Sequence, residues 1–227
     1  MTAKRVLIMC TSANKLKDVD TGCWAEEVCA PFYIWKKHGI TATIGSIKGG
    51  EVPMDDASLN PPFLTKEVEE FLLDDEAMKG LTESVPLADA KVADYDAIFL
   101  PGGHGCVADF PDNAALIKLV EEFAAAGKVV AAVCHGPNGL VNVKGPDGKP
   151  LVAGKKVTGF SNAEEYAVAK ENLVPFMLED KLKELGGKFE MAKEKWASHA
   201  VVDGKLATGQ NPGSSIAVAE LVAKLLS

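Results

Sequence analysis

Val129-Val130-Ala131-Ala132-Val133-Cys134-His135-Gly136-Pro137 is the stretch that decides the fold. Its apolar, partly β-branched run is typical of a buried strand, and the run stops abruptly at a cysteine. A small residue at Ala132 and a glycine at Gly136 bracket Cys134. This is the spacing of a nucleophile elbow, a sharp strand-to-helix turn in which close backbone approach excludes side chains. The pattern therefore predicts that Cys134 lies at the carboxyl edge of a sheet.

The surroundings of Cys134 give two interpretations. If a helix begins near Pro137, whose fixed φ suits a first helical position, its free N–H groups and positive dipole end favour the thiolate. His135 can then supply a base or a countercharge. The alternative is that Cys134 is a small buried hydrophobe, the commonest role of a free cysteine. The elbow spacing, the adjacent histidine and the preceding strand coincide, and they favour the functional interpretation.

Strand-like and helix-like segments alternate along the rest of the chain. Expected strands cover 5–10, 41–47, 97–100, 129–133 and 155–160, expected helices cover 21–37, 65–73, 113–126, 179–185 and 214–226, and a hairpin is expected over 200–208. This alternation predicts a doubly wound, mostly parallel α/β sheet with helices on both faces, the flavodoxin-like arrangement. Functional groups are expected at the carboxyl ends of the strands, where both Cys134 and the glycine loop Pro101-Gly102-Gly103-His104-Gly105 fall.

The composition is that of a globular protein with one sizeable core. Of the 227 residues, 47% are hydrophobic and 25% are charged, which are ordinary values. We expect a single domain over residues 1–227. Residues 49–94 are rich in proline, aspartate and glutamate and carry short helical pieces. This segment is interpreted as an inserted lobe.

Charge and cysteine usage exclude several classes of protein. The net charge of −8, without any block of lysine or arginine, argues against nucleic acid or an anionic membrane surface as a partner. No signal peptide opens the sequence and no apolar stretch is long enough to span a bilayer, so we expect a cytoplasmic protein. Five cysteines without a C-x-x-C pair argue against a disulfide framework and a structural zinc site.

Three motifs resemble those of the ThiJ/PfpI superfamily, which has the class I glutamine amidotransferase-like fold. They are Pro101-Gly-Gly-His-Gly105, Ala131-Ala-Val-Cys-His-Gly-Pro137 and Thr208-Gly-Gln-Asn-Pro212. The stretch Gly22-Cys-Trp-Ala-Glu-Glu-Val-Cys-Ala-Pro-Phe32 and the inserted lobe resemble one branch more narrowly. That branch contains heat-shock-associated chaperones and glutathione-independent glyoxalases, also called glyoxalase III or D-lactate dehydratases. The resemblance runs from residue 5 to residue 225.

The resemblance implies a catalytic role for four side chains. Cys134 is implied as the nucleophile, His135 as its acid–base partner, Glu27 as the carboxyl group beside the sulfur, and Glu165 as the group that orients the histidine. No metal and no organic cofactor are implied. The departure from the family is Ala30, where many relatives carry a histidine, and this bears on substrate preference.

Both glutamates have a glutamate neighbour, so each assignment is a choice. Glu27 is chosen over Glu26 because the family's carboxylate lies four residues before the proline of a Pro-aromatic pair, here Pro31-Phe32. Glu165 is chosen over Glu164 on its spacing after the Thr158-Gly-Phe160 stretch. Without the resemblance, a Glu-Glu pair is most often a solvated helix face.

Two further expectations concern chemistry near Cys134. A carboxyl group held in an apolar cleft has a raised pKa, so Glu27 can stay protonated and donate to a thiolate. The backbone N–H groups of Gly103 and His135 are the expected oxyanion hole, because glycine lets a carbonyl oxygen approach the main chain. A purely structural turn is the alternative for that loop.

The remaining histidines and cysteines receive structural interpretations. His104 has no acid or thiol at a recognisable spacing, so we interpret it as a satisfied loop histidine rather than a catalyst or metal ligand. His38 and His199 are treated in the same way. Packing roles are expected for the other cysteines, Cys10, Cys23, Cys29 and Cys106.

The resemblance implies an enzyme that converts methylglyoxal, a small 2-oxoaldehyde, to D-lactate through a Cys134 hemithioacetal, without glutathione. A homodimer is also implied. Two alternatives stay open. The same elbow could serve a cysteine hydrolase or deglycase, or the chain could be a non-enzymatic holding chaperone or thiol redox sensor. A glutamine amidotransferase fits less well, because no late His-x-Glu pair follows the elbow.

Overall fold

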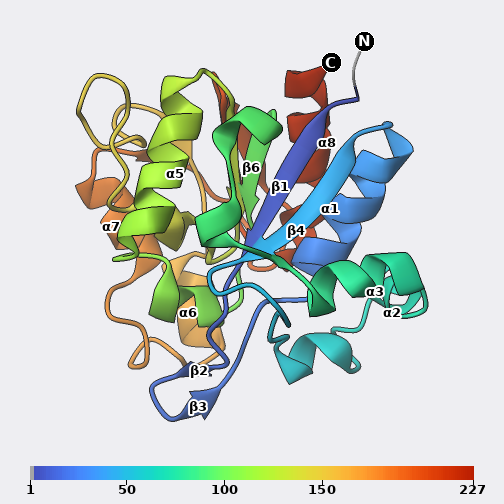
Figure 1. Cartoon of the computed structure of the whole chain (residues 1–227). Helices are drawn as coiled ribbons and strands as arrows, with labels where there is room; N and C mark the ends of the chain where they lie inside the picture. The colour runs from blue at the N-terminus through green and yellow to red at the C-terminus, as the bar shows by residue number, and fades with distance from the viewer. Residues whose placement is uncertain (1–2) are drawn as a thin grey trace.

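A seven-stranded sheet runs through the centre of the computed structural model, which describes residues 3–227 (Figure 1). The order across the sheet is β10 (Ala200–Asp203), β11 (Leu206–Gly209), β7 (Val129–Val133), β6 (Ala97–Leu100), β1 (Arg5–Cys10), β4 (Thr41–Ser46) and β5 (Val85–Pro86). All neighbouring strands are parallel except β10 and β11, which form an antiparallel hairpin. Every residue of β6 and β7 is buried, as expected when helices cover both faces of a parallel sheet. The predicted mostly parallel α/β fold is confirmed.

Helices cover the two faces of the sheet. α1 (Glu26–Lys37) and α8 (Ser215–Leu226) pack side by side on one face, and α5 (Ala114–Ala125) packs against β6 and β7 on the other (Figure 1). Trp35 links α1 to α8, because its indole N–H donates to the carbonyl oxygen of Ala219 at 3.1 Å. The Trp35 ring also packs edge-on against Phe99 of β6, with 5.2 Å between ring centroids.

Residues 49–94 contain several short elements. They are α2 (Lys66–Leu72), α3 (Asp75–Thr82), β5 and three 3₁₀ helices at Asp56–Leu59, Leu87–Asp89 and Val92–Asp94. Buried Phe71 of α2 packs edge-to-face against Phe32 of α1, with ring centroids 5.2 Å apart. β5 pairs with the end of β4 and so extends the main sheet. The segment therefore both covers α1 and supplies an edge strand.

The N-terminal part of the expected helix over 21–37 is not helical. α1 begins at Glu26, because the residues before it make backbone contacts with two other loops. The N–H of Cys23 donates to the carbonyl oxygen of Pro53 at 2.7 Å, and the N–H of Trp24 donates to that of Gly102 at 3.2 Å. These contacts hold the chain beside the glycine loop instead of extending α1.

Two other expected elements are shorter than the sequence suggests. The helix expected after Cys134 is a single 3₁₀ segment, Gly136–Leu140. The strand expected over 155–160 is reduced to β8 (Lys156–Val157), which pairs with β9 (Lys188–Phe189) outside the main sheet. In both places the chain leaves the regular element to bring residues to the edge of the sheet.

The remaining elements are short and lie in loops. They are β2 (Lys15–Leu16), β3 (Val19–Asp20), α4 (Gly105–Asp109), α6 (Asn162–Ala167), α7 (Leu178–Glu184) and a 3₁₀ turn at Pro212–Ser214. Among residues 3–227, the structure has no helix that combines the length and the apolar character needed to cross a membrane. Helices α4 and α6 matter for the site, because each carries or adjoins one of its side chains.

Candidate active site

Cys134 sits on a sharp turn directly after β7. Its φ of 60° lies in the left-handed region, which residues with side chains seldom adopt and which is a feature of nucleophile elbows. A Cβ atom at Gly136 would come within 2.0 Å of the carbonyl oxygen of Leu100 in β6. Only a glycine therefore allows the chain to turn here, and the turn holds the Cys134 sulfur at the carboxyl edge of the sheet.

His135 contacts both the thiol and a carboxylate. Its Nδ1 lies 3.5 Å from the sulfur of Cys134, and its Nε2 lies 2.7 Å from Oε2 of Glu165. Because an ionised carboxylate only accepts hydrogen bonds, we assign the ring proton to Nε2. The lone pair of Nδ1 then faces Cys134. His135 is therefore arranged to receive the thiol proton.

The structure separates the roles of Glu164 and Glu165, which neighbour each other in α6. Glu165 turns toward His135, whereas Glu164 closes the capping box at the start of the helix with Ser161. The other oxygen of Glu164 accepts three hydrogen bonds, from the side chains of Gln210 (3.0 Å) and Asn211 (2.8 Å) and from the backbone of Trp196 (3.1 Å). The glutamate chosen from the sequence is therefore the one that contacts the histidine.

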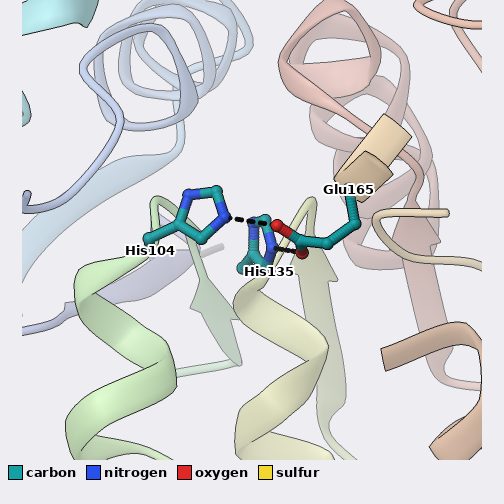
Figure 2. A group of neighbouring side chains, drawn as sticks. All are labelled: His104, His135 and Glu165. Carbon is teal, nitrogen blue, oxygen red and sulfur yellow. Dashed lines mark hydrogen bonds and ion pairs between the residues drawn. The ribbon is translucent and has the colours of Figure 1, made fainter. Parts of the chain in front are cut away.

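His104 is a second histidine on the same carboxylate. Its Nε2 lies 2.8 Å from Oε1 of Glu165, so the two imidazole rings bind the two oxygens of one side chain (Figure 2). Burial, followed by the proximity of His135, lowers the pKa of His104 to about 4. From the sequence alone, His104 is expected to be a satisfied loop histidine. It is satisfied, but its partner is the carboxylate that also holds His135.

Glu165 stays ionised despite its burial. Burial raises its pKa, but the hydrogen bonds from His104 and His135 outweigh burial and hold the pKa of Glu165 well below its usual range. Within residues 3–227, these three side chains form the group whose composition could hold a metal ion, with ligand atoms within 4.8 Å of one another. Each histidine nitrogen already hydrogen bonds to its own oxygen of the Glu165 carboxylate, so the geometry is that of a closed acid–base group.

Glu27 of α1 approaches Cys134 from another direction. It is fully buried, and its Oε2 accepts the backbone N–H of Gly102 at 2.6 Å. Among the residues that the structure describes, its Oε1 has no hydrogen-bond partner of good geometry. Burial raises the pKa of Glu27 to about 8, against the lowering effect of the Gly102 N–H and of an interaction with Cys134. Glu27 is therefore protonated at neutral pH.

Glu26, the rejected neighbour, is only half-buried. Burial, followed by the charge of Glu67, raises the pKa of Glu26 to about 7. Glu67 belongs to α2, so the charge that affects Glu26 comes from that helix. Of the two glutamates it is Glu27 that interacts with Cys134.

The Cys134 sulfur rests as a thiol rather than as the thiolate that the expected helix would favour. Burial raises the pKa of Cys134 well above its usual value, and the charge of an ionised Glu27 would raise it further. The backbone N–H of Gly103 opposes this shift by donating to the sulfur. The segment after the elbow is too short to offset burial with a helix dipole, because the dipole effect needs a sustained helix. The thiol therefore needs His135 as a base.

The glycine loop fits tightly against this site. A Cβ atom at Gly102 would lie 2.5 Å from the backbone nitrogen of His135, and one at Gly103 would lie 2.3 Å from the carbonyl oxygen of Gly22. Gly103 also has a φ of 87°, which suits glycine. The absence of side chains here lets the backbone N–H groups of Gly103 and His135 lie beside Cys134.

The other predicted packing residues stay apart from this chemistry. Cys10, Cys23, Cys29 and Cys106 are buried free thiols. His38 forms an exposed pair with Glu220, with Nε2 and Oε2 2.9 Å apart. The structure therefore brings together Cys134, His135, Glu27, Glu165 and Gly103, and it adds His104.

A family model described as the DJ-1/PfpI family matches residues 19–225 of the chain. The chain belongs to the DJ-1/PfpI family. This confirms the resemblance to the ThiJ/PfpI superfamily that the sequence motifs indicated. The match spans all the elements that carry Cys134, His135 and the two glutamates.

Relatives of this DJ-1/PfpI protein carry names that specify an activity. The chain is 32% identical to "Glutathione-independent glyoxalase HSP31" of Saccharomyces cerevisiae, over 95% of this chain and 94% of that protein. It is 31% identical to "Glyoxalase 3" of Candida albicans, over 95% of each chain. The crystal structure of glyoxalase III from Candida albicans superposes with a TM-score of 0.89, covering 98% of this chain and 97% of the other. The Rapid Encystment Protein 24 KDa of Francisella tularensis superposes with a TM-score of 0.93 at 38% identity, over 99% of each chain.

Proposed function

We propose that this DJ-1/PfpI protein is a glutathione-independent glyoxalase, a lyase of the D-lactate dehydratase (glyoxalase III) type. Its substrates are methylglyoxal and other small 2-oxoaldehydes, and the product from methylglyoxal is D-lactate. The observation that carries the proposal is a thiol with a histidine base on one side, 3.5 Å away, and a protonated carboxyl group on the other. The names of the yeast and Candida relatives support the same reaction.

The first step forms a bond between the sulfur and the substrate. Nδ1 of His135 takes the thiol proton, and the Cys134 sulfur attacks the aldehyde carbon. The C–S bond forms as the electron pair of the carbonyl π bond moves to oxygen. The backbone N–H groups of Gly103 and His135 stabilise this oxyanion, and His135 then returns the thiol proton to it, which gives the hydroxyl of a hemithioacetal and a neutral His135. The protonated Glu27 stabilises the sulfur while it carries negative charge.

The second step moves hydrogen between neighbouring carbons. His135 removes the proton from the former aldehyde carbon and passes it to the ketone oxygen, which gives an enediol. His135 then carries the hydroxyl proton of the former aldehyde carbon to the adjacent carbon, and the electron pair left behind forms the thioester carbonyl. The former aldehyde carbon becomes a thioester as its neighbour becomes an alcohol, so no external oxidant or reductant is needed. Water hydrolyses the lactoyl thioester, releases lactate and restores the thiol. Glu165 keeps the proton of His135 on Nε2 throughout.

Replacement of the nucleophile tests this proposal. Cys134→Ala should lower D-lactate formation from methylglyoxal, measured without glutathione, by at least about 10⁴-fold, because removal of a covalent nucleophile leaves only binding effects. Cys29→Ala is the matched control, since it removes another buried thiol of the same chain. Its rate should stay within about threefold of wild type, as expected for a site outside the chemistry. Comparable turnover by wild type and Cys134→Ala would contradict covalent catalysis.

We also propose the assignments that concern the whole molecule. They are a single domain over residues 1–227 with an inserted lobe at 49–94, a homodimer, a cytoplasmic location and no nucleic acid or membrane partner. The net charge of −8 supports the absence of a nucleic-acid partner. Light scattering of the purified protein would test the dimer, with a mass near twice 24.0 kDa expected.

A further inference from the structure

We propose that His104 is a positioning residue for the glyoxalase reaction, because it fixes the Glu165 carboxylate and through it the ring tautomer of His135. The inference rests on the proposed function for its kinetic consequence, but its structural consequence can be measured without turnover. His104 comes from the glycine loop, before α4, and no local sequence pattern connects it with Glu165, 61 residues away.

His135 needs a Glu165 carboxylate that is held in one orientation. His135 can accept the thiol proton only while its own proton stays on Nε2, the nitrogen 2.7 Å from Glu165 Oε2. A glutamate side chain has several rotatable bonds, so one hydrogen bond does not fix the direction of its carboxylate. A second donor on the other oxygen does fix it, and His104 supplies that donor at 2.8 Å.

Solvent cannot replace the hydrogen bond that His104 donates to Glu165. The His104 and Glu165 side chains are 10% and 4% exposed. A buried carboxylate oxygen without a donor is unfavourable, because it has lost its water without a compensating partner. Without His104, the Glu165 carboxylate would therefore rotate. Alternatively, both of its oxygens would depend on the one imidazole donor that remains, His135.

The loop that carries His104 is held by several contacts with the site. The same five-residue loop donates the Gly102 N–H to Glu27 and the Gly103 N–H to the Cys134 sulfur. The His104 ring also lies against the His135 ring, with 4.0 Å between centroids (Figure 2). One loop thus contacts Glu27, Cys134 and Glu165 in succession, and a shift of His104 would be transmitted to all three.

The test compares two substitutions of His104. His104→Gln keeps an N–H donor that can reach Glu165, whereas His104→Leu has similar bulk and no donor. Nitrogen-15 NMR of the His135 ring should report protonated Nε2 and unprotonated Nδ1 in wild type and His104→Gln. His104→Leu should show a mixture of the two tautomers. The same single tautomer in His104→Leu would overturn the proposal, and this readout requires only a folded protein.

Kinetics give the second readout. His104→Leu should lower kcat by roughly 10- to 100-fold with KM within about twofold, the pattern of a lost transition-state contribution, and His104→Gln should recover most of the loss. Equal losses of kcat in both variants would contradict the positioning role. His38→Gln, which alters the exposed pair with Glu220, is the matched control and should leave kcat unchanged.

Discussion

Two buried glutamates flank the Cys134–His135 pair, and their surroundings drive them to opposite protonation states. Burial disfavours the ionised form of both side chains. Glu27 receives one backbone N–H, from Gly102, and its pKa rises to about 8. Glu165 receives an imidazole N–H on each oxygen, and its pKa is held well below the usual range. One site therefore contains one carboxylic acid and one carboxylate.

The difference shows that the donors of a carboxyl group, rather than its burial, decide its charge here. Glu27 can donate to the sulfur because it keeps its proton, and Glu165 accepts from His135 because it does not. When two carboxyl groups lie in different environments, one pKa is raised and the other is lowered. This is a general way to obtain acid and base functions from the same residue type. Substitution of one glutamate at a time separates the two roles.

The largest effect in this comparison is expected from Glu165→Gln. The variant removes the negative charge that keeps the proton on Nε2 of His135, so kcat should fall by roughly 10²- to 10³-fold, somewhat less than for the comparable change in a serine protease triad. Turnover of methylglyoxal to D-lactate measures it. Glu164→Gln is the matched control in the same helix. It should lower the melting temperature, because Glu164 anchors Asn211 and Gln210, but leave kcat within about threefold. A greater loss of kcat in Glu164→Gln would reverse the assignment.

Glu27→Gln should have a smaller effect. A glutamine can still donate to the sulfur, so kcat at pH 7 should fall by only about 10-fold or less, the scale of one altered hydrogen bond. The pH dependence should change more clearly. In wild type, the iodoacetamide reaction of Cys134 should show a break near pH 8, where ionisation of Glu27 raises the pKa of the thiol. Glu27→Gln should lack this break.

Glu26→Gln is the control for that break. Glu26 carries a charge that raises the pKa of Glu27, so its removal should keep the break and move it slightly to lower pH. A break that persists unchanged in Glu27→Gln, or that disappears in Glu26→Gln, would show that another group titrates beside Cys134.

The last expected effect is on the pH dependence of stability. Glu27 has a folded-state pKa of about 8 and an ordinary value of 4.5, so between these values the unfolded chain releases a proton that the folded chain keeps. The free energy of unfolding should therefore fall by up to about 1.4 kcal/mol per pH unit as the pH rises through this window. Glu27→Gln should flatten that slope in urea unfolding measured from pH 5 to pH 8. An identical slope in wild type and Glu27→Gln would mean that Glu27 is ionised when folded.

Glu165 gives the opposite dependence. Its folded-state pKa is depressed, so it stabilises the folded chain above pH 4.5 and loses that contribution as the pH falls. Glu165→Gln should therefore reduce the acid sensitivity of unfolding below about pH 4.5 and leave the slope at higher pH. The two substitutions thus separate the two carboxyl groups by the pH range in which each one changes stability.

Much of the fold was predictable because its signals are local. Within nine residues, the apolar run of β7 predicts a buried strand, and the small residues around Cys134 predict a tight turn. The alternation of strands and helices gives the parallel sheet. The ends of elements were less predictable, as at α1, which starts at Glu26 because two distant loops hold the residues before it.

The candidate site was predictable where a motif fixes the spacing. Glu27 and Glu165 could be chosen over their neighbours only through the family pattern, because each stands in a Glu-Glu pair that could face solvent. His104 could not be assigned from the chain alone, since its partner is 61 residues away. The segment before α6 returns to the site, where the Phe160 N–H donates to the carbonyl oxygen of Cys134 at 2.8 Å. The charge states were partly predictable. Burial of Glu27 was expected, but a thiol at Cys134 was not, because burial outweighs the short 3₁₀ segment after it.

The most direct test of the opposite charge states is carbon-13 NMR of the side-chain carboxyl groups in protein labelled at glutamate Cδ. Glu27→Gln and Glu165→Gln would assign the two signals. At pH 7 the Glu27 signal should have the shift of a protonated carboxyl group and titrate near pH 8, while the Glu165 signal should remain that of a carboxylate down to pH 4. Two carboxylate signals at pH 7 would contradict the account, because Cys134 would then face a negative charge in place of a proton donor.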